Sequence, residues 1–320
     1  MACLLFPFSL LFLAMISARR AAYRLGWLRS ERLPVPVVVV GNITVGGSGK
    51  TPLVVHLAWA LRELGRSPGV VTRGFRGRAE LPTAVAPDGD PIQFGDESLL
   101  LAQRCGCPVF VGRDRAAAGR ALLADHPSCD VILADDGLQH YRLQRDVELV
   151  VFDARGVMNG WCLPAGPLRE PPARLATVDA VILNENAVLP APTFAGPVFS
   201  MRLEGEIFRR LDDPGQVCRA ADLAGLNLHA VAGIGAPGRF FAHLRRLGLE
   251  IAEHPYPDHH GYVAEDLEFT GDAILTTEKD AVKLASLNLL IPVWVLPVAA
   301  CLTPDLGAFV LEKLHGCPSA

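Results

Sequence analysis

A glycine-rich segment at residues 41–51, with the sequence GNITVGGSGKT, has the residue types of a phosphate-binding loop. The backbone N–H groups of such a loop, placed at the start of a helix, surround an anion. Lys50 would neutralise phosphate charge, and the hydroxyl of Thr51 would reach a Mg²⁺ ion. Thr44 stands where the strict pattern has its first glycine, although two glycines inside the loop still permit close approach of the backbone. The segment therefore predicts a nucleotide site formed by Thr44, Val45, Gly46, Gly47, Ser48, Gly49, Lys50 and Thr51.

Two adjacent carboxylates, Asp135 and Asp136, follow the apolar run of residues 131–134. A strand that ends in carboxylates at the carboxyl edge of a parallel sheet can hold Mg²⁺, or its bound waters, opposite a phosphate loop. Taken alone, the pair would also fit a turn or a helix cap, just as the glycine-rich segment alone would fit a turn without a ligand. Because both occur in one chain, we expect a site for a nucleotide and Mg²⁺.

The elements that must position these residues alternate between strands and helices. The run at residues 35–40 predicts a strand buried on both faces, and residues 50–64 predict a helix stopped by Gly65. Further strands are expected at 69–72, 108–112, 131–134, 147–153, 180–184, 228–232, 273–276 and 293–298, and helices at 97–104, 115–125, 239–247 and 306–314. This alternation predicts an α/β fold with a P-loop NTPase-type parallel sheet flanked by helices.

Length and composition favour more than one domain. The chain has 320 residues, of which 50% are hydrophobic and 20% charged, and a domain usually takes about 100–200 residues. Residues 189–197, LPAPTFAGP, are rich in proline and small side chains and mark a plausible boundary. We therefore expect a P-loop kinase-type core at residues 31–195 and a smaller C-terminal α/β domain at 196–320.

Charge and cysteine usage exclude some classes of function. The formal net charge is −4, and residues 1–32 hold five Arg and one Glu, so the remaining 288 residues carry −8. This acidic body argues against a nucleic-acid partner. The eight cysteines form no pair or cluster at zinc spacing, which predicts reduced thiols in a cytosolic body. The sequence gives no signal for an obligatory protein partner.

The first 30 residues predict an apolar membrane-anchor helix with a basic flank. Residues 1–18 contain no charged side chain and would form a helix of about 27 Å, just under the roughly 30 Å of a bilayer core. Arg19, Arg20, Arg24 and Arg29 follow the apolar run, whereas a signal peptide has basic residues before it. These charges favour a cytoplasmic location for the following chain. The helix would span or lie in the interface; packing on the protein's own core and a cleaved signal are the alternatives.

Several longer motifs resemble the tetraacyldisaccharide 4′-kinases, the lipid A 4′-kinases of Gram-negative bacteria. The phosphate loop VGNITVGGSGKTP and the string DDGLQH at residues 135–140 carry the resemblance, together with TRGFRG at 72–77 and LPAGPLRE at 163–170. Shorter strings agree in order, namely GDE at 95–97, PDHH at 257–260 and TEKD at 277–280. The resemblance spans essentially the whole chain, and the strings at 135–140 and 163–170 are the most specific.

The resemblance implies transfer of the γ-phosphate of ATP to the 4′-hydroxyl of a tetraacylated glucosamine disaccharide 1-phosphate. The acceptor is a lipid A precursor in lipopolysaccharide biosynthesis, and the reaction would take place at the cytoplasmic face of the inner membrane. ATP and Mg²⁺ are the implied cofactors, and the active site would lie in the cleft between the two domains. Ser98 and Ser48 depart from the family pattern, but neither change removes a charge or a ligand.

Specific roles follow from the same resemblance. Asp96 resembles the family's base and His259 its partner from the other domain, although Asp96 would also serve as the N-cap of the helix at 97–104. The adjacent His260 leaves the identity of that partner open. The expected catalytic residues are Asp96, His259, Asp135, Asp136 and Lys50, and the expected metal ligands are Thr51, Asp136 and Glu97. The groups expected to contact the acceptor or the transferring phosphate are Arg73, Arg76, Arg115, Gln139, His140, Arg169 and Glu170.

Two rival interpretations rest on other features. Residues 233–238, GIGAPG, fit a dinucleotide-binding turn with Glu253 at the matching distance, but Pro237 removes an N–H near the expected pyrophosphate. A membrane-associated regulatory P-loop ATPase or GTPase without a lipid acceptor is the second rival. A GTPase would be expected to carry an N-K-x-D string, and the TEKD string at 277–280 differs from it at two positions.

Overall fold

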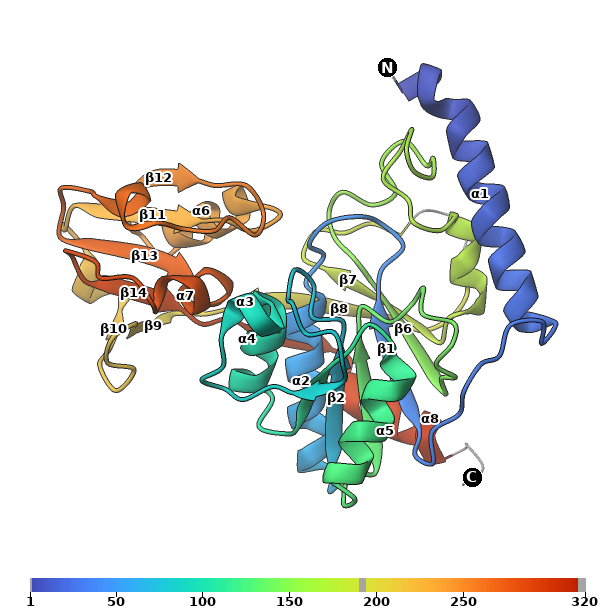
Figure 1. Ribbon diagram of the computed structural model, residues 1–320. Helices are drawn as coiled ribbons and strands as arrows, with labels where there is room; N and C mark the ends of the chain where they lie inside the picture. The colour runs from blue at the N-terminus through green and yellow to red at the C-terminus, as the bar shows by residue number, and fades with distance from the viewer. Residues whose placement is uncertain (1, 190–193, 316–320) are drawn as a thin grey trace.

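The computed structural model describes residues 2–189 and 194–315, which form two β-sheets with helices around them (Figure 1). The first sheet has nine strands in the order β15-β8-β7-β6-β1-β5-β2-β4-β3, and the second has six in the order β10-β9-β14-β13-β11-β12. In Figure 1 the second sheet lies on the left of the molecule, while the N-terminal helix α1 lies on the far right. The P-loop NTPase-type sheet expected from the sequence is therefore present.

The first sheet is parallel in its centre. β1 pairs in parallel with β5 and β6, and only β3 and β15, at the two edges, pair antiparallel with their neighbours. Its strands are β1 (Val37–Gly41), β2 (Pro68–Thr72), β3 (Thr83–Ala84), β4 (Val109–Val111), β5 (Val131–Asp135), β6 (Val147–Phe152), β7 (Ala180–Asn184), β8 (Val198–Glu204) and β15 (Ala299–Thr303). Because parallel strands start at the same edge, the segments that follow β1, β5, β6 and β7 meet at one edge.

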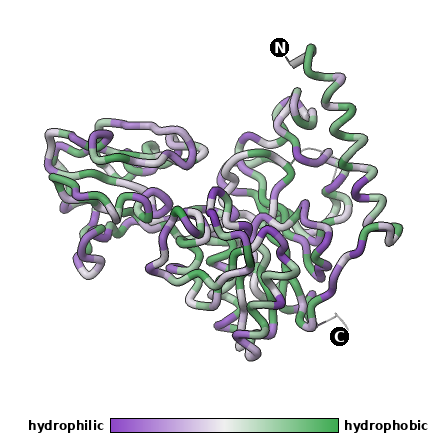
Figure 2. The backbone as a smooth tube through the Cα atoms, viewed as in Figure 1, coloured by the Kyte–Doolittle hydropathy of each residue, from purple (hydrophilic) through white to green (hydrophobic). Residues whose placement is uncertain are grey.

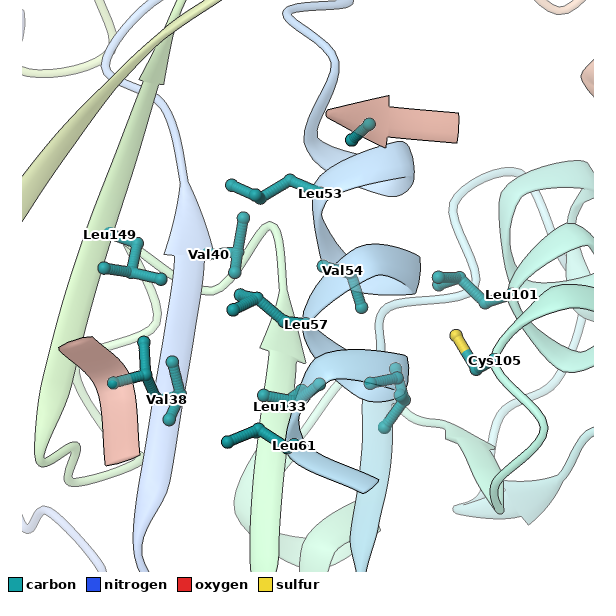
Figure 3. Close-up of a cluster of buried hydrophobic side chains, with 14 of the residues drawn as sticks. Val38, Val40, Leu53, Val54, Leu57, Leu61, Leu101, Cys105, Leu133 and Leu149 are labelled. Atoms are coloured by element: carbon teal, nitrogen blue, oxygen red, sulfur yellow. The ribbon is translucent and has the colours of Figure 1, made fainter. Parts of the chain in front are cut away.

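Both faces of this sheet are covered by helices, which explains the continuous β-branched run of β1. Val38 and Val40 pack on one side with α2, α4 and α8, and Figure 3 shows this cluster. Val37 and Val39 pack on the other side with α5 and part of α1. Burying each such side chain stabilises the fold by about 1.5–3 kcal/mol. These helices are α1 (Ala2–Arg24), α2 (Lys50–Glu63), α4 (Asp96–Arg104), α5 (Arg115–Asp125) and α8 (Leu306–His315).

The second sheet forms a smaller α/β unit with its own core. β11 pairs in parallel with β12 and β13, and Phe208, Phe241 and Leu244 are buried beneath it. Its strands are β9 (Ile207–Arg210), β10 (Val217–Arg219), β11 (Leu228–Ala232), β12 (Ile251–Pro255), β13 (Ala273–Thr277) and β14 (Val293–Leu296). The short helices nearby are α6 (Pro237–Arg246), α7 (Glu278–Leu284), η2 (Ala220–Leu223) and η3 (Ala264–Leu267), while α3 (Pro91–Phe94) and η1 (Pro172–Thr177) belong to the first unit.

The first sheet does not end at residue 195, where the sequence predicts a domain boundary. β8 pairs in parallel with β7, and β15 returns from the second sheet to pair antiparallel with β8. Leu306 and Val310 of α8 are then buried in the first core. The predicted boundary thus falls between β7 and β8, two paired strands of one sheet. The second unit is an insertion between β8 and β15, because edge strand β15 and helix α8 complete the first core.

Helix α1 packs one face against the first unit and exposes the other. Ser9 is buried and donates a hydrogen bond to the carbonyl of Cys162 at 2.8 Å, and Phe6 lies against Trp161 with ring centroids 4.7 Å apart. Leu4 and Leu11 on the outer face are 80% and 68% exposed, and the tube in Figure 2 is mostly green, that is hydrophobic, along the first part of α1. Among the described residues, α1 is the one helix long and apolar enough to cross a membrane.

The cysteines with described side chains are free thiols. They are Cys105, Cys107, Cys129, Cys162, Cys218 and Cys301, whereas Cys317 lies outside the described residues.

Candidate active site

The glycine-rich segment connects β1 to α2 at the carboxyl edge of the first sheet. α2 begins at Lys50, and its N-cap residue Gly49 has a φ of 94°, a conformation that favours glycine. A Cβ atom on Gly49 would lie 2.5 Å from Nδ2 of Asn184, so no other residue fits there. The segment 167–169 pairs with the loop, since Val45 donates its N–H to Pro167 and Arg169 donates to Ile43. The loop is therefore held in one conformation at the start of α2.

Asp136 is surrounded by cationic side chains beside the loop. Its carboxylate lies 3.5 Å from Nζ of Lys50 and accepts two hydrogen bonds from Nη1 of Arg169, at 2.9 and 3.1 Å. Burial opposes ionisation, but the charges of Lys50 and Arg169 outweigh it and hold the pKa of Asp136 below its usual range. Arg115 is almost fully buried and donates from Nη2 to the Asp136 carbonyl at 3.4 Å. Asp136 is thus an anion that Lys50, Arg115 and Arg169 surround.

Asp135 has the properties of an oxygen ligand for a hard cation. Its side chain is buried, and Oδ1 has no hydrogen-bond partner among the described residues, while Oδ2 accepts from Thr72 at 3.4 Å. Burial and the nearby charges of Glu97 and Asp136 raise its pKa to about 7. A divalent cation would compensate this concentration of negative charge, and oxygen donors suit Mg²⁺. The carboxylate oxygens at this edge of the first sheet are therefore suitable ligands for Mg²⁺.

A second cluster contains Asp96, at the start of α4. Both carboxylate oxygens of Asp96 accept from Nδ1 of His259, at 2.9 and 3.0 Å. Nζ of Lys279 donates to Nε2 of His259 at 3.2 Å and to Glu97 at 2.9 Å, which agrees with a proton on Nδ1 of the imidazole. Burial disfavours the charged form of Asp96, but the hydrogen bond from His259 and the charge of Lys279 outweigh it and lower its pKa. The cluster therefore keeps Asp96 ionised.

The structure distinguishes between the alternatives that the sequence leaves open here. His260 turns away from Asp96 and contacts Asp266, with 2.9 Å between Nε2 and Oδ2. Asp96 is not the N-cap of its helix, because Gly95 occupies that position with a φ of 82°. The pair formed by Asp96 and His259 joins two segments that are 163 residues apart in the chain.

The other predicted residues divide into two groups. Arg73 and Arg76 are exposed in the segment after β2, and Arg76 donates to the carbonyl of His259 at 2.7 Å. Gln139 supports the loop by donating to the carbonyl of Asn42 at 3.0 Å.

His140 and Glu170 are occupied by contacts within the fold. The ring of His140 accepts from the backbone N–H of Arg115, at the start of α5, with 3.2 Å to Nε2. Burial and the charge of Arg115 lower the pKa of His140 to about 4, so the ring is neutral. Glu170 is buried, accepts from Tyr141 at 2.7 Å and pairs with Arg174 at 3.0 Å. These contacts indicate that both side chains stabilise the segments around the site rather than contact a ligand.

A cavity of about 240 Å³ between the two units is lined by residues from both clusters, including Lys50 beside Asp136 and Glu97 beside Asp96. Residues 47–52 of the loop and α2 line one wall, and Glu97 and Lys279 line the side that leads to Asp96. Apolar side chains form much of the remainder, which suits a nucleotide base or another flat ring. They include Val55, Leu100, Leu203, Ile234, Phe240, Leu296 and Val298. The loop is thus placed opposite the second unit across this cavity.

The glycine turn at residues 233–238 closes against this same loop. A Cβ atom on Gly235 would lie 3.0 Å from the backbone N of Gly47, so the turn brings the two backbones together. Glu253, which a dinucleotide site would use for ribose, forms an ion pair with Arg245 at 2.6 Å. The turn therefore serves packing between the two units rather than a second nucleotide.

The sequence does not indicate the roles of three residues at the site. Lys279 lies inside the TEKD string but has no expected role there, and Arg155 and Asn184 hold the outer side of the loop. Arg155 and Asn184 stand at or just after the carboxyl ends of β6 and β7, where ligand sites form in parallel sheets. Their position at the carboxyl ends of predicted strands could have identified both residues as candidates for the site.

The central parallel sheet, the loop ending in Lys50 and Thr51, and the carboxylates after β5 define a protein of the P-loop NTPase class. A model of the family "Tetraacyldisaccharide-1-P 4′-kinase" matches residues 1–315, and the chain belongs to this family.

Curated relatives and a solved structure agree with this assignment. The chain is 54% identical to the tetraacyldisaccharide 4′-kinase of Aromatoleum aromaticum, over 99% of this chain and 95% of the relative. It is 51% identical to that of Chromobacterium violaceum, over 98% and 95%. Its structure is similar to that of LpxK from Aquifex aeolicus in complex with ATP, with a TM-score of 0.79, 29% identity and 98% of each chain covered.

Proposed function

We propose that this protein transfers the γ-phosphate of ATP to the 4′-hydroxyl of a tetraacylated glucosamine disaccharide 1-phosphate. The observation that carries the proposal is one cavity lined both by the loop ending in Lys50 and by Glu97 and Lys279, which adjoin the Asp96 and His259 pair. One side suits a triphosphate and the other suits a hydroxyl that must lose a proton. The names of the relatives, and the ATP in the LpxK structure, support the same reaction.

Each side chain has a part in this reaction that follows from its contacts. Lys50 and the N–H groups at the start of α2 would hold the phosphates, and Arg115 and Arg169 would oppose the charge of the transferring group. Asp96 would accept the proton of the attacking hydroxyl, while His259 fixes the orientation of the carboxylate.

Thr51, Asp135, Asp136 and Glu97 offer the oxygens that would hold Mg²⁺. The bound ion would neutralise charge on the phosphate oxygens. The unpartnered Oδ1 of Asp135 favours this residue as a direct ligand, because the oxygens of Asp136 already accept from Arg169.

We further propose that α1 attaches the protein to the cytoplasmic face of the inner membrane. Its outer face is apolar, and Arg19, Arg20 and Arg24 follow at its carboxyl end, where anionic headgroups would meet them. The inner face is occupied by contacts from Ser9 and Phe6 to the first unit. A helix with one face docked to a polar domain is better suited to lying in the interface than to crossing the bilayer alone.

The test is incubation of the purified protein with γ-labelled ATP, Mg²⁺ and the disaccharide acceptor, followed by separation of the lipids. We expect label in a lipid bisphosphate that is absent when the acceptor is omitted. Hydrolysis without labelled lipid, or a preference for GTP, would instead favour a regulatory P-loop ATPase or GTPase.

A further inference from the structure

Three consecutive carbonyl oxygens of the phosphate loop accept hydrogen bonds from side chains, two of which lie outside the loop. The bonds run from Asn42 Nδ2 to Gly46 at 3.4 Å, from Arg155 Nη2 to Gly47 at 2.9 Å, and from Asn184 Nδ2 to Ser48 at 2.9 Å. We call Arg155 and Asn184, which make the two short bonds, the carbonyl clamp. Neither Arg155 nor Asn184 belongs to the loop itself.

The clamp fixes the direction of the loop's N–H groups. A peptide unit is planar and trans, so its C=O and N–H point in opposite directions. A carbonyl of Gly47 that points outward to Arg155 therefore turns the N–H of Ser48 inward, and the carbonyl of Ser48 does the same for Gly49. Successive N–H groups turned to one side form an anion-binding concavity. The clamp thus arranges this part of the loop before any ligand binds.

Both members of the clamp are themselves held firmly. Arg155 is bound by Asp153, which is 5% exposed, through contacts of 2.6 to 3.1 Å from Nε and Nη2. Its Nη1 also occupies the space beside Gly46, where a Cβ atom would lie 2.7 Å away. Asn184 is fully buried at the end of β7. Asp153 follows β6 and Asn184 ends the adjacent parallel strand β7, so the sheet fixes the clamp's position.

We propose that Arg155 and Asn184 are positioning residues that hold the loop in its phosphate-binding conformation. The proposal rests on the proposed nucleotide site. In this role Arg155 acts through the backbone of Gly47 and contributes to the affinity for every nucleotide whose β-phosphate lies in the loop. ATP and ADP share that phosphate, whereas a side chain that touched the γ-phosphate would favour ATP alone.

The experiment measures the dissociation constants of ATP and ADP by isothermal titration calorimetry on the full chain. For Arg155→Ala we expect about tenfold weaker binding of both nucleotides, the effect of one charge-assisted hydrogen bond. Arg155→Lys, which keeps a donor, should recover part of the loss. Arg66→Ala is the matched control, because Arg66 is also paired with one carboxylate, that of Asp130 at 2.8 Å, and lies away from the cavity. The control should bind both nucleotides as the wild type does.

Thermal unfolding and a second variant separate positioning from a general loss of stability. The melting temperatures of Arg155→Ala and Arg66→Ala should agree within a few degrees, since Arg155 is 37% exposed. Asn184→Ala should weaken ATP and ADP equally if it folds. The proposal is overturned if Arg155→Ala binds both nucleotides within twofold of the wild type, or loses affinity for ATP alone. A wild-type protein that binds neither nucleotide would instead overturn the proposed function.

Discussion

Replacing Asp96 with Asn tests the proposed base with little change in shape. In the wild type, Nδ1 of His259 lies 2.9 and 3.0 Å from the two carboxylate oxygens of Asp96. The amide of the variant keeps one oxygen that can accept this hydrogen bond, but the amide cannot take a proton from the acceptor. A positioned general base contributes about 10²- to 10⁴-fold to a rate, or about 3–5 kcal/mol in the barrier. We therefore expect kcat to fall by that factor with saturating ATP and detergent-dispersed acceptor.

The fold should tolerate this change because the neighbouring cations keep other partners. Lys279 retains Glu97 at 2.9 Å, and Lys283 retains Asp280 at 2.8 Å. The loss is then one charge-assisted hydrogen bond, about 1.5–3 kcal/mol of unfolding free energy, which chemical denaturation would measure. The affinity for ATP should stay within twofold, because Asp96 is not among the residues that line the cavity beside the loop.

A second carboxylate and imidazole pair provides the control. Asp266 contacts His260 at 2.9 Å, one residue along the chain from His259 and outside the cavity. Asp266→Asn should therefore lose a similar contact without lowering kcat. The reasoning is refuted if Asp96→Asn is folded and retains more than half of the wild-type kcat, or if both variants lose activity equally.

Three further predictions follow from the contacts described above. Lys50→Ala should raise the dissociation constant of ATP at least tenfold by calorimetry, and unchanged affinity would exclude Lys50 from the phosphate site. His140 has a folded pKa of about 4 against 6.5 for the free side chain, so only the unfolded chain binds its proton between these values. The free energy of unfolding should hence fall by up to about 3 kcal/mol as pH decreases from 6.5 to 4, and urea titrations of His140→Gln should show less of this fall. Leu11→Glu on the outer face of α1 should reduce sedimentation with anionic vesicles, whereas Leu290→Glu, at an 87% exposed position in the second unit, should not; equal sedimentation would contradict the anchor.

The phosphate loop and the central strands could be predicted because their signals are local. The β-branched run of β1, the glycine-rich turn and the amphipathic segment of α2 follow one another within thirty residues or so, and each has a distinct composition. α5 begins at Arg115 as expected, since Asp114 caps it by accepting from the N–H of Ala116 at 3.1 Å. These elements need no information from distant parts of the chain.

Strands β8 and β15 and the domain boundary could not be predicted for the opposite reason. β8 alternates between buried and exposed residues, and β15 is mostly exposed, so neither has the apolar run of a central strand. Their pairing joins residues about one hundred positions apart, as with Ala300 and Leu203. The proline-rich sequence at 189–197 then resembles a boundary, although the chain pairs with the same sheet on both sides of it. Such long-range pairing is decided by tertiary packing rather than by local preference.

The charge on Asp96 connects the two units of the fold. Asp96 belongs to α4 of the first unit, but His259 and Lys279, which stabilise its ionised form, belong to the second. Further contacts between the units surround the cavity, including the ion pairs of Arg104 with Glu278 and of Arg239 with Glu185. If the second unit were displaced, Asp96 would lose the hydrogen bond from His259 and the charge of Lys279, two interactions that lower its pKa. The second unit therefore contributes directly to the electrostatic environment of a carboxylate that belongs to the first.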